Sequence, residues 1–149
     1  MPCRGPDDGG MRQAQTEISV DTPGRGLVEV TGQVVDWTAR QGMATGMLTV
    51  YCRHTSASLT IQENADPDVM RDLESFFQRL VADDPSLYRH TAEGPDDMPA
   101  HIRSALTDVS LNLPLAQGRP LLGTWQGIYL FEHRLRPHRR RLVLHAQGD

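Results

Sequence analysis

The chain has 149 residues, which suits one domain, because a fold of this length buries roughly 70% of the surface of its unfolded chain. Its 19 acidic and 15 basic residues give a net charge of −4, which argues against nucleic acid and anionic membranes as partners. No apolar run approaches the roughly 20 residues of a transmembrane helix, and the first residues lack the apolar stretch of a signal peptide. We therefore expect a cytoplasmic protein.

The first third of the chain predicts a leader, two strands and a short helix. Residues 1–12 hold three Gly and two Pro and predict a flexible leader before a single domain over residues 13–149. Residues 13–20 alternate in polarity, and residues 47–52 form a dense apolar run, so both predict strands. Residues 31–41 predict a short helix with Thr31 as its N-cap, although residues 28–35 are also compatible with a strand.

A further strand over residues 56–62 is followed by the clearest helix signal of the chain. Asp66 is the expected N-cap and Pro67 the first helical residue. Apolar side chains then recur at helical spacing and predict a face that packs on the core: Val69, Met70, Leu73, Phe76, Phe77, Leu80 and Val81. This helix is interpreted as structural.

The second half of the chain predicts one more helix and several strands. A short helix is expected to begin near Pro99, with His101 in its first turn and either Asp96 or Asp97 as its cap. Strands are expected at residues 110–115, 120–122, 127–132 and 141–145, with turns at 117–118 and 136–137. The fold class is therefore α+β: a single domain of mostly antiparallel sheets with two or three helices.

Residues 88–103 are the first candidate for the functional site, since they are rich in polar side chains and poor in residues for a core. His90 and His101 flank Glu93, Asp96 and Asp97, and a loop folding back on the helix start would place both imidazoles on one ion. The expected cofactor is a divalent metal such as Zn, Mn or Mg, and imidazole with carboxylate also suits Fe or Ni better than Ca. A solvated loop without a ligand is the alternative.

His54 ends the predicted central strand and is followed by a polar run that contains Ser56 and Ser58. An imidazole and hydroxyl groups at a strand end are suited to binding a phosphate or supporting a metal site. The alternative is an ordinary turn stabilised by serine and threonine hydroxyls.

A third polar group lies around the last predicted strands. Trp125 and Gln126 lie between two glycines, so they could stack on a planar ligand or carry a subunit contact, or form a turn with a half-buried Trp. Glu132 and Arg134 alternate along one strand and predict an ion pair. Arg134 and Arg141 on facing strands predict a bidentate anion site, although surface arginines are usually only solvated.

Five motifs in order resemble the YjbQ family, described as secondary thiamine-phosphate synthase enzymes. They are His54-Thr-Ser-Ala-Ser58-Leu, Glu63-Asn64-Ala-Asp66-Pro67, Tyr88-x-His90-x-x-Glu93-Gly94, Asp97-Met98-Pro99-Ala-His101-Ile, and Gly123-Thr-Trp-Gln-Gly127 with Glu132-x-Arg134. The resemblance implies an α+β fold, a compact homotrimer with a site near the subunit interface, and a weak thiamine-phosphate synthase activity. That reaction couples a pyrimidine methyl pyrophosphate to a thiazole phosphate with loss of pyrophosphate.

These observations together define the expected site and its alternatives. The expected catalytic residues are His54, Glu93 and Asp66, and the expected metal ligands are His90, His101 and His54. The expected substrate-binding residues, for a small phosphorylated metabolite, are Ser56, Ser58, Asn64, Trp125, Gln126, Arg134 and Arg141. The alternatives are a non-catalytic trimer that binds a metal or small anion, and a metal-dependent hydrolase of a phosphorylated metabolite.

Overall fold

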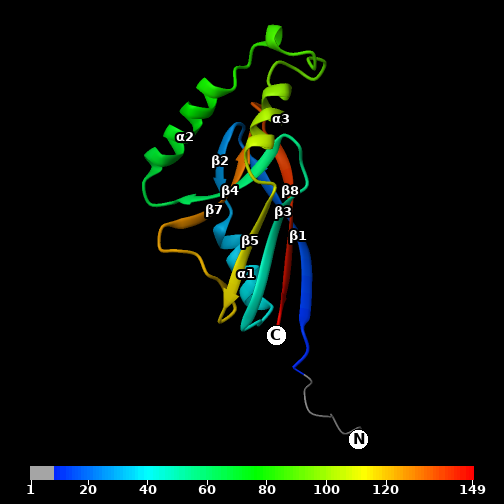
Figure 1. Ribbon diagram of the computed structural model, residues 1–149, viewed down its shortest axis with the longest axis vertical. Helices are drawn as coiled ribbons and strands as arrows, with labels where there is room; N and C mark the ends of the chain where they lie inside the picture. The colour runs from blue at the N-terminus through cyan, green and yellow to red at the C-terminus, as the bar shows by residue number, and fades with distance from the viewer. Residues whose placement is uncertain (1–8) are drawn as a thin grey trace, which may run out of the picture.

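The computed structural model describes residues 9–149, which fold into two antiparallel sheets with three α-helices around them (Figure 1). The elements are β1 (Arg12–Thr22), β2 (Gly26–Glu29), α1 (Thr31–Arg40), β3 (Thr45–Cys52), β4 (Ala57–Glu63), α2 (Pro67–Leu80), the 3-10 turn η1 (Pro85–Leu87), α3 (Asp97–Leu106), β5 (Ser110–Ala116), β6 (Arg119–Pro120), β7 (Gln126–Glu132) and β8 (His138–Gly148). The predicted α+β class with mostly antiparallel pairing is confirmed.

The larger sheet has the strand order β1-β8-β3-β5-β6, and the smaller has the order β2-β7-β4. Every strand pair is antiparallel, and a bridge between Leu59 and Asp108 links β4 to the segment before β5. Figure 1 shows α3 at the end of the sheets opposite the C-terminus. The ends of several strands therefore lie near α3, where polar side chains can meet.

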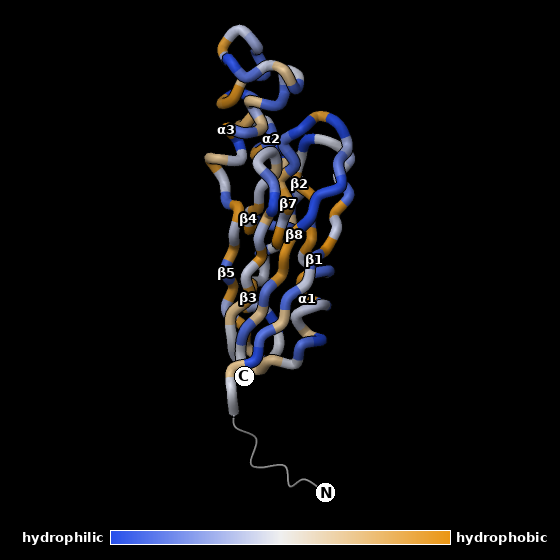
Figure 2. The backbone as a smooth tube through the Cα atoms, turned by 90° about the vertical axis from the view of Figure 1, so that its right-hand side faces the viewer, coloured by the Kyte–Doolittle hydropathy of each residue, from blue (hydrophilic) through white to orange (hydrophobic). Residues whose placement is uncertain are grey.

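The core lies between the inner faces of the two sheets. Alternate residues of β3, β5 and β8 point inward because strand side chains alternate between faces, and orange segments alternate with paler and blue ones along β5 in Figure 2. The buried set includes Leu48, Val50, Leu111, Leu113, Leu142 and Leu144 from the larger sheet and Leu59, Ile128 and Leu130 from the smaller one. Helix α1 adds Val34, which is fully buried.

Strand boundaries differ from the predictions mainly at the chain ends. Residues 1–8 of the expected leader lie outside the described residues, and the last leader residue, Arg12, already begins β1. Strand β8 covers residues 138–148 where 141–145 were predicted, because it pairs with β1 on one side and β3 on the other. Pairing with neighbours therefore extends strands beyond their apolar stretches.

Helix α1 begins one residue earlier than an N-cap at Thr31 would place it. Thr31 is the first helical residue, Val30 occupies the cap position, and no side chain caps this end. The Thr31 hydroxyl instead donates to Glu29 at 2.8 Å and accepts the backbone N–H of Ile128 at 2.8 Å. The residue is therefore used to join α1 to β7, and the predicted cap is wrong.

Helix α2 forms as predicted but does not pack as predicted. Asp66 caps it, accepting the backbone N–H of Asp68 at 2.9 Å. None of its residues is buried, however, and Phe76 and Leu80 remain 49% and 54% exposed. Phe77 makes an edge contact with Phe131 at 5.3 Å between ring centroids. Figure 1 shows α2 lying beside the sheets rather than across them.

Within residues 9–149, no helix is both long enough and apolar enough to cross a membrane.

Candidate functional site

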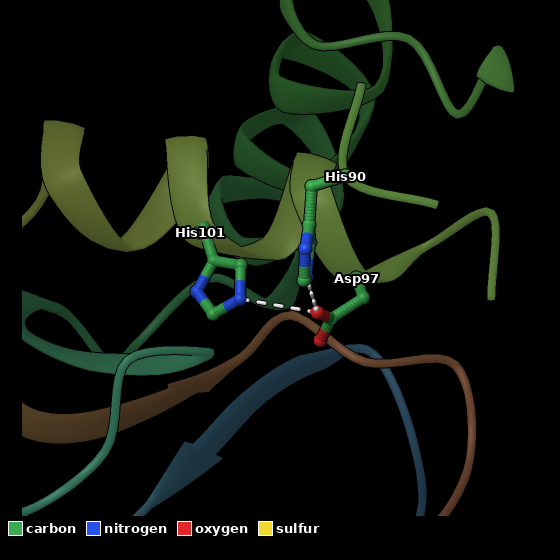
Figure 3. Close-up of side chains that lie close together, drawn as sticks. All are labelled: His90, Asp97 and His101. Carbon is green, nitrogen blue, oxygen red and sulfur yellow. Dashed lines mark hydrogen bonds and ion pairs between the residues drawn. The ribbon is translucent and has the colours of Figure 1, made fainter. Parts of the chain in front are cut away.

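The site candidate in the described residues is a cluster of His90, Asp97 and His101 at the start of α3 (Figure 3). Asp97 and His101 are four residues apart on one helix, so they share a face one turn apart. His90 comes from the preceding loop, which folds back onto this turn. One ligand atom from each residue lies within 4.8 Å of the others, so the structure brings the two predicted histidines together.

Both histidines meet the same carboxylate oxygen. His90 Nε2 lies 2.7 Å from Asp97 Oδ2, and His101 Nε2 lies 3.1 Å from it. The other ring nitrogen of His101, Nδ1, lies 2.9 Å from the carbonyl oxygen of Thr55. A carbonyl oxygen only accepts hydrogen bonds, so Nδ1 carries the hydrogen. In neutral His101, Nε2 therefore points a lone pair at an anionic oxygen.

The cluster combines a buried carboxylate with accessible imidazoles. The Asp97 side chain is 2% exposed, whereas those of His90 and His101 are 43% and 32% exposed. Burial alone would raise the pKa of Asp97, but the hydrogen bond with His90, the interaction with His101 and the charge of Arg134 outweigh it and hold that pKa below its ordinary value. Asp97 is therefore a buried anion, and the two histidines lie between its carboxylate and the solvent.

Arg134 holds the buried side of the cluster. It follows β7 in the chain, and its Nη1 donates to Asp97 Oδ1 at 2.6 Å while its Nε donates to Asp96 Oδ2 at 3.0 Å. The backbone N–H of Leu135 also donates to Asp96, at 2.9 Å. Asp96 occupies the cap position of α3 but makes no side-chain cap bond. The prediction that one of the two aspartates caps this helix is therefore confirmed for the position of Asp96, but its side chain bonds to Arg134 and Leu135 and not to the helix.

The predicted ion pair between Glu132 and Arg134 is also wrong. The fully buried Glu132 carboxylate pairs with Arg140, which comes from the neighbouring part of β8. Arg134 meets this carboxylate only through its backbone N–H, which donates to Glu132 at 3.0 Å, and not through its guanidinium. Arg134 and Arg141 likewise do not face a common anion, because Arg141 pairs with Glu17 on β1 at 3.1 Å. Residue alternation along one strand did not reveal these partners, since they come from other strands and loops.

The structure places His54 apart from the cluster of His90, Asp97 and His101. Its Nε2 accepts the backbone N–H of Arg141 at 2.8 Å, and its Nδ1 lies 3.4 Å from Arg140 Nη1. Burial, followed by the charge of Arg140, lowers the pKa of His54. A nitrogen that already accepts a backbone hydrogen bond has no lone pair left for a metal. His54 is thus held by β8, and Thr55 beside it is the residue that reaches the cluster.

The hydroxyls of the two serines in the same motif bond to residues outside the cluster. Ser56 Oγ accepts from Arg140 at 3.0 Å. Ser58 is fully buried, 2.8 Å from His133 Nε2 and 2.6 Å from the hydroxyl of Thr107. Neither hydroxyl is directed at the cluster.

The remaining predicted residues either bond to nearby turns and helix ends or lie exposed at the surface. Asn64 donates to Glu29 at 3.1 Å, and Gln126 accepts the backbone N–H of Gly123 at 2.8 Å. Trp125 is 62% exposed. Asp66 caps α2, as described above, and the Glu93 side chain is exposed while its carbonyl oxygen accepts from Arg134 at 3.0 Å. Only Glu93 among these belongs to the loop that carries His90.

The sequence motifs do not reveal two contributions to this site, from Asp97 and from Thr55. The sequence predicts Asp97 only as a possible helix cap, although its spacing of four residues from His101 on a predicted helix is the signal that identifies it as a partner. Thr55 contributes a carbonyl oxygen, and no side-chain pattern reports on that. The structure therefore adds two groups to the predicted histidines. One is the carboxylate of Asp97, and the other is the carbonyl oxygen of Thr55, which fixes the tautomer of neutral His101.

Fold and site together define a single-domain α+β protein with an accessible cluster of two histidines and one carboxylate. Residues 16–149 match the model of a protein family described as UPF0047 protein YjbQ-like. The chain belongs to this family.

Relatives of the chain agree with this assignment along nearly their whole length. A UPF0047 protein of Synechocystis is 51% identical over 93% of this chain and 94% of its own, and the UPF0047 protein YjbQ of Salmonella typhimurium is 43% identical over 91% and 98%. A crystal structure from Sulfolobus solfataricus, described as a YbjQ-like protein of unknown function, has a TM-score of 0.86 at 22% identity, covering 94% of this chain and 100% of that one. The latter likeness supports the fold alone.

Proposed function

We propose that His90, Asp97 and His101 bind a divalent transition metal, and that the protein uses this ion to act on a small phosphorylated metabolite. The observation that carries the proposal is the contact between His101 Nε2 and Asp97 Oδ2 at 3.1 Å, with the hydrogen of neutral His101 held on Nδ1 by Thr55. A lone pair and a carboxylate oxygen repel each other unless a cation lies between them. A proton or a metal ion can satisfy this arrangement.

The surroundings of the cluster favour a metal ion. Metal-binding histidines usually donate their other N–H to a carbonyl or carboxylate, and ligating carboxylates are themselves hydrogen-bonded. His101 has such a partner in Thr55, and Asp97 has one in Arg134. Two imidazole nitrogens and one carboxylate oxygen suit Zn or Mn, while Mg prefers oxygen ligands and ordered water. Zn and Mn are therefore favoured over Mg.

Three protein ligands leave room for a substrate. Structural zinc sites usually have four protein ligands, whereas catalytic sites keep an open position. His90 and His101 are 43% and 32% exposed, so a ligand from solvent can approach them. This accessibility favours an enzyme over the alternative of a non-catalytic metal-binding trimer.

The chemistry fits reactions in which charge develops on a phosphate group. A bound divalent ion supplies Lewis-acid stabilisation of phosphoryl or pyrophosphoryl oxygens. His90 and His101 hold the ion, Asp97 balances its charge, and the exposed carboxylate of Glu93 is the candidate base in the same loop. The thiamine-phosphate synthase reaction implied by the family resemblance, with pyrophosphate as leaving group, is the first reaction to test. Hydrolysis of a phosphate ester is the second.

Metal titration of the purified protein tests the binding step. Wild type is expected to bind one Zn²⁺ or Mn²⁺ per chain, and His101→Gln is expected to lose this binding. His145→Gln is the matched control, because His145 contacts Gln15 at 2.9 Å on the larger sheet, away from the cluster. Equal binding by wild type and His101→Gln would show that the cluster is not a metal site.

Activity assays with the two thiamine half-substrates, and separately with small phosphate esters, test the catalytic step. Product is expected to depend on added metal and on His101. Glu93→Gln is expected to lower the rate and leave metal affinity unchanged, since Glu93 bonds to Arg134 through its backbone carbonyl oxygen, which the substitution keeps. Metal binding without product in either assay would favour the non-catalytic alternative.

A further inference from the structure

Arg134 is the charged residue that contacts the loop of the proposed metal site most extensively. Its side chain is only 10% exposed and lies where the chain leaves β7. Motif reasoning predicted that it binds the phosphate of a substrate. Its contacts point to a different role.

The guanidinium of Arg134 donates to three acceptors in the segment from Glu93 to Asp97. Nε donates to Asp96 Oδ2 at 3.0 Å, Nη1 to Asp97 Oδ1 at 2.6 Å, and Nη2 to the carbonyl oxygen of Glu93 at 3.0 Å. The donors of an arginine lie in one rigid plane, so three such bonds fix the position of the segment that accepts them. Little of the side chain remains exposed to meet a phosphate.

The two oxygens of the Asp97 carboxylate lie in different environments. Oδ1 accepts from Arg134, and Oδ2 faces both histidine Nε2 atoms at 2.7 and 3.1 Å. Without the bond at Oδ1, the carboxylate could rotate about its Cβ–Cγ bond and present either oxygen, or neither, to the histidines. Metal ligands that lose such support typically bind about 10- to 100-fold more weakly.

We infer that Arg134 is a positioning residue of the metal site, which holds Asp97 so that a single oxygen, Oδ2, faces His90 and His101. The inference rests on the proposed function, because it assumes that these three residues bind a metal. It assigns to Arg134 an effect on metal affinity and coordination geometry, not direct contact with substrate.

The alternative is that Arg134 merely anchors the loop. Asp96→Asn separates the two roles, because it weakens the anchor at Nε and leaves the bond from Nη1 to Asp97 in place. A positioning role predicts that Arg134→Lys weakens metal binding far more than Asp96→Asn does. Lysine keeps the charge but replaces the planar donor set with a single point of contact.

The experiment is Co²⁺ titration followed by visible absorption, which reports both affinity and coordination geometry. Arg134→Lys is expected to bind Co²⁺ about 10- to 100-fold more weakly than wild type and to give an altered spectrum at saturation. Arg139→Lys is the matched control, because Arg139 is 69% exposed and pairs with Asp21 at the surface. Its titration and spectrum should equal those of wild type.

The outcomes separate the inference from the proposal beneath it. If wild type itself binds no Co²⁺ in the cluster, the proposed metal site fails. If wild type binds and Arg134→Lys shows the same affinity and spectrum, the positioning role alone is overturned. Equal losses in Arg134→Lys and Asp96→Asn would also overturn it. Saturating Co²⁺ stabilises the folded state, so the spectrum remains measurable even for a destabilised variant.

Discussion

Glu132 and Arg140 form a charged pair inside the protein. The Glu132 side chain is 0% exposed and that of Arg140 is 5% exposed. Burial alone would raise the pKa of Glu132, but its hydrogen bonds with Arg140 and with the backbone of Arg134 hold that pKa below its ordinary value. Thr22 donates a further hydrogen bond to the same carboxylate at 2.8 Å. The carboxylate is thus buried as an ion and depends on its partners.

Removing the arginine should therefore be strongly destabilising. Arg140→Met leaves Glu132 buried without its cation, and loss of one partner of a buried pair costs about 3–5 kcal/mol. We expect the free energy of unfolding, measured by urea denaturation, to fall by this amount. Arg139→Met, at an exposed position of the same strand, should change it by less than about 0.5 kcal/mol. A loss of similar size in both variants would contradict the assignment.

His133 is a second buried titratable residue, fully enclosed beside Phe131 and Ser58. Burial, followed by the charge of Arg103, lowers the pKa of His133 to about 3. In the unfolded chain the ordinary value is 6.5. Between these values the unfolded chain binds a proton that the folded protein does not, so stability is present above pH 6.5 and is lost as the pH falls.

The pH dependence of unfolding tests this residue. We expect His133→Gln to reduce the slope of unfolding free energy against pH by up to about 1.4 kcal/mol per pH unit below pH 6.5. The range between pH 6.5 and 4.5 is the informative one, because carboxylates such as Glu132 titrate lower. Some slope should remain, since the pKa of His54 is also lowered. His145→Gln is the control. If the slope for His133→Gln equals that of wild type, His133 is not buried in its neutral form.

At the scale of elements, α2 shows how a helix can be specified locally and still bury none of its residues. Its start is set by Asp66 and Pro67, which act within two residues along the chain. Its apolar face is only partly covered, and Phe76 is 49% exposed. The helix therefore depends more on its own cap than a helix packed across a sheet would.

Loss of the cap should be measurable. Asp66→Ala removes the acceptor for the backbone N–H of Asp68, which typically costs about 1 kcal/mol. We expect a corresponding fall in the free energy of unfolding, with metal binding unchanged, although the sequence predicts a catalytic role for Asp66. Asp72→Ala, in the exposed middle of the helix, is the control. Loss of activity without loss of stability would restore the catalytic interpretation.

At the scale of the whole molecule, the outer face of the larger sheet carries apolar side chains. Tyr51 and Met47 on β3 are 46% and 37% exposed, and Tyr51 lies directly opposite Val143 of β8 in the strand register. A face of this kind is available for contact with another copy of the chain. It supports, as a proposal, the homotrimer that the family resemblance implies.

A charge on this face should disrupt such an assembly. We expect wild type to sediment with the mass of a trimer and Tyr51→Lys to shift toward monomer, because an ammonium group would be buried without a partner. Arg12→Lys, at the start of β1, keeps the charge at a position removed from Tyr51 and is the control. A monomeric mass for wild type would remove the trimer proposal and leave the metal site untouched.

Much of the fold was predictable because its signals are local. Alternating polarity marked β1, a dense apolar run marked β3, helical spacing and Asp66 marked α2, and the concentration of polar residues marked the loop around His90. Local signals also placed His101 near the start of a helix. They extend only to neighbours two to four residues away.

The sequence by itself therefore determined the α+β class, most elements, the family and the two histidines of the cluster. Only the tertiary structure decided which charges pair, because Arg134 and Asp97 are 37 residues apart in the chain and meet only when the segment after β7 lies against the start of α3. It also decided that Thr55 sets the tautomer of His101, 46 residues away. Periodicity identifies which face of an element a side chain occupies, and packing determines what that side chain meets.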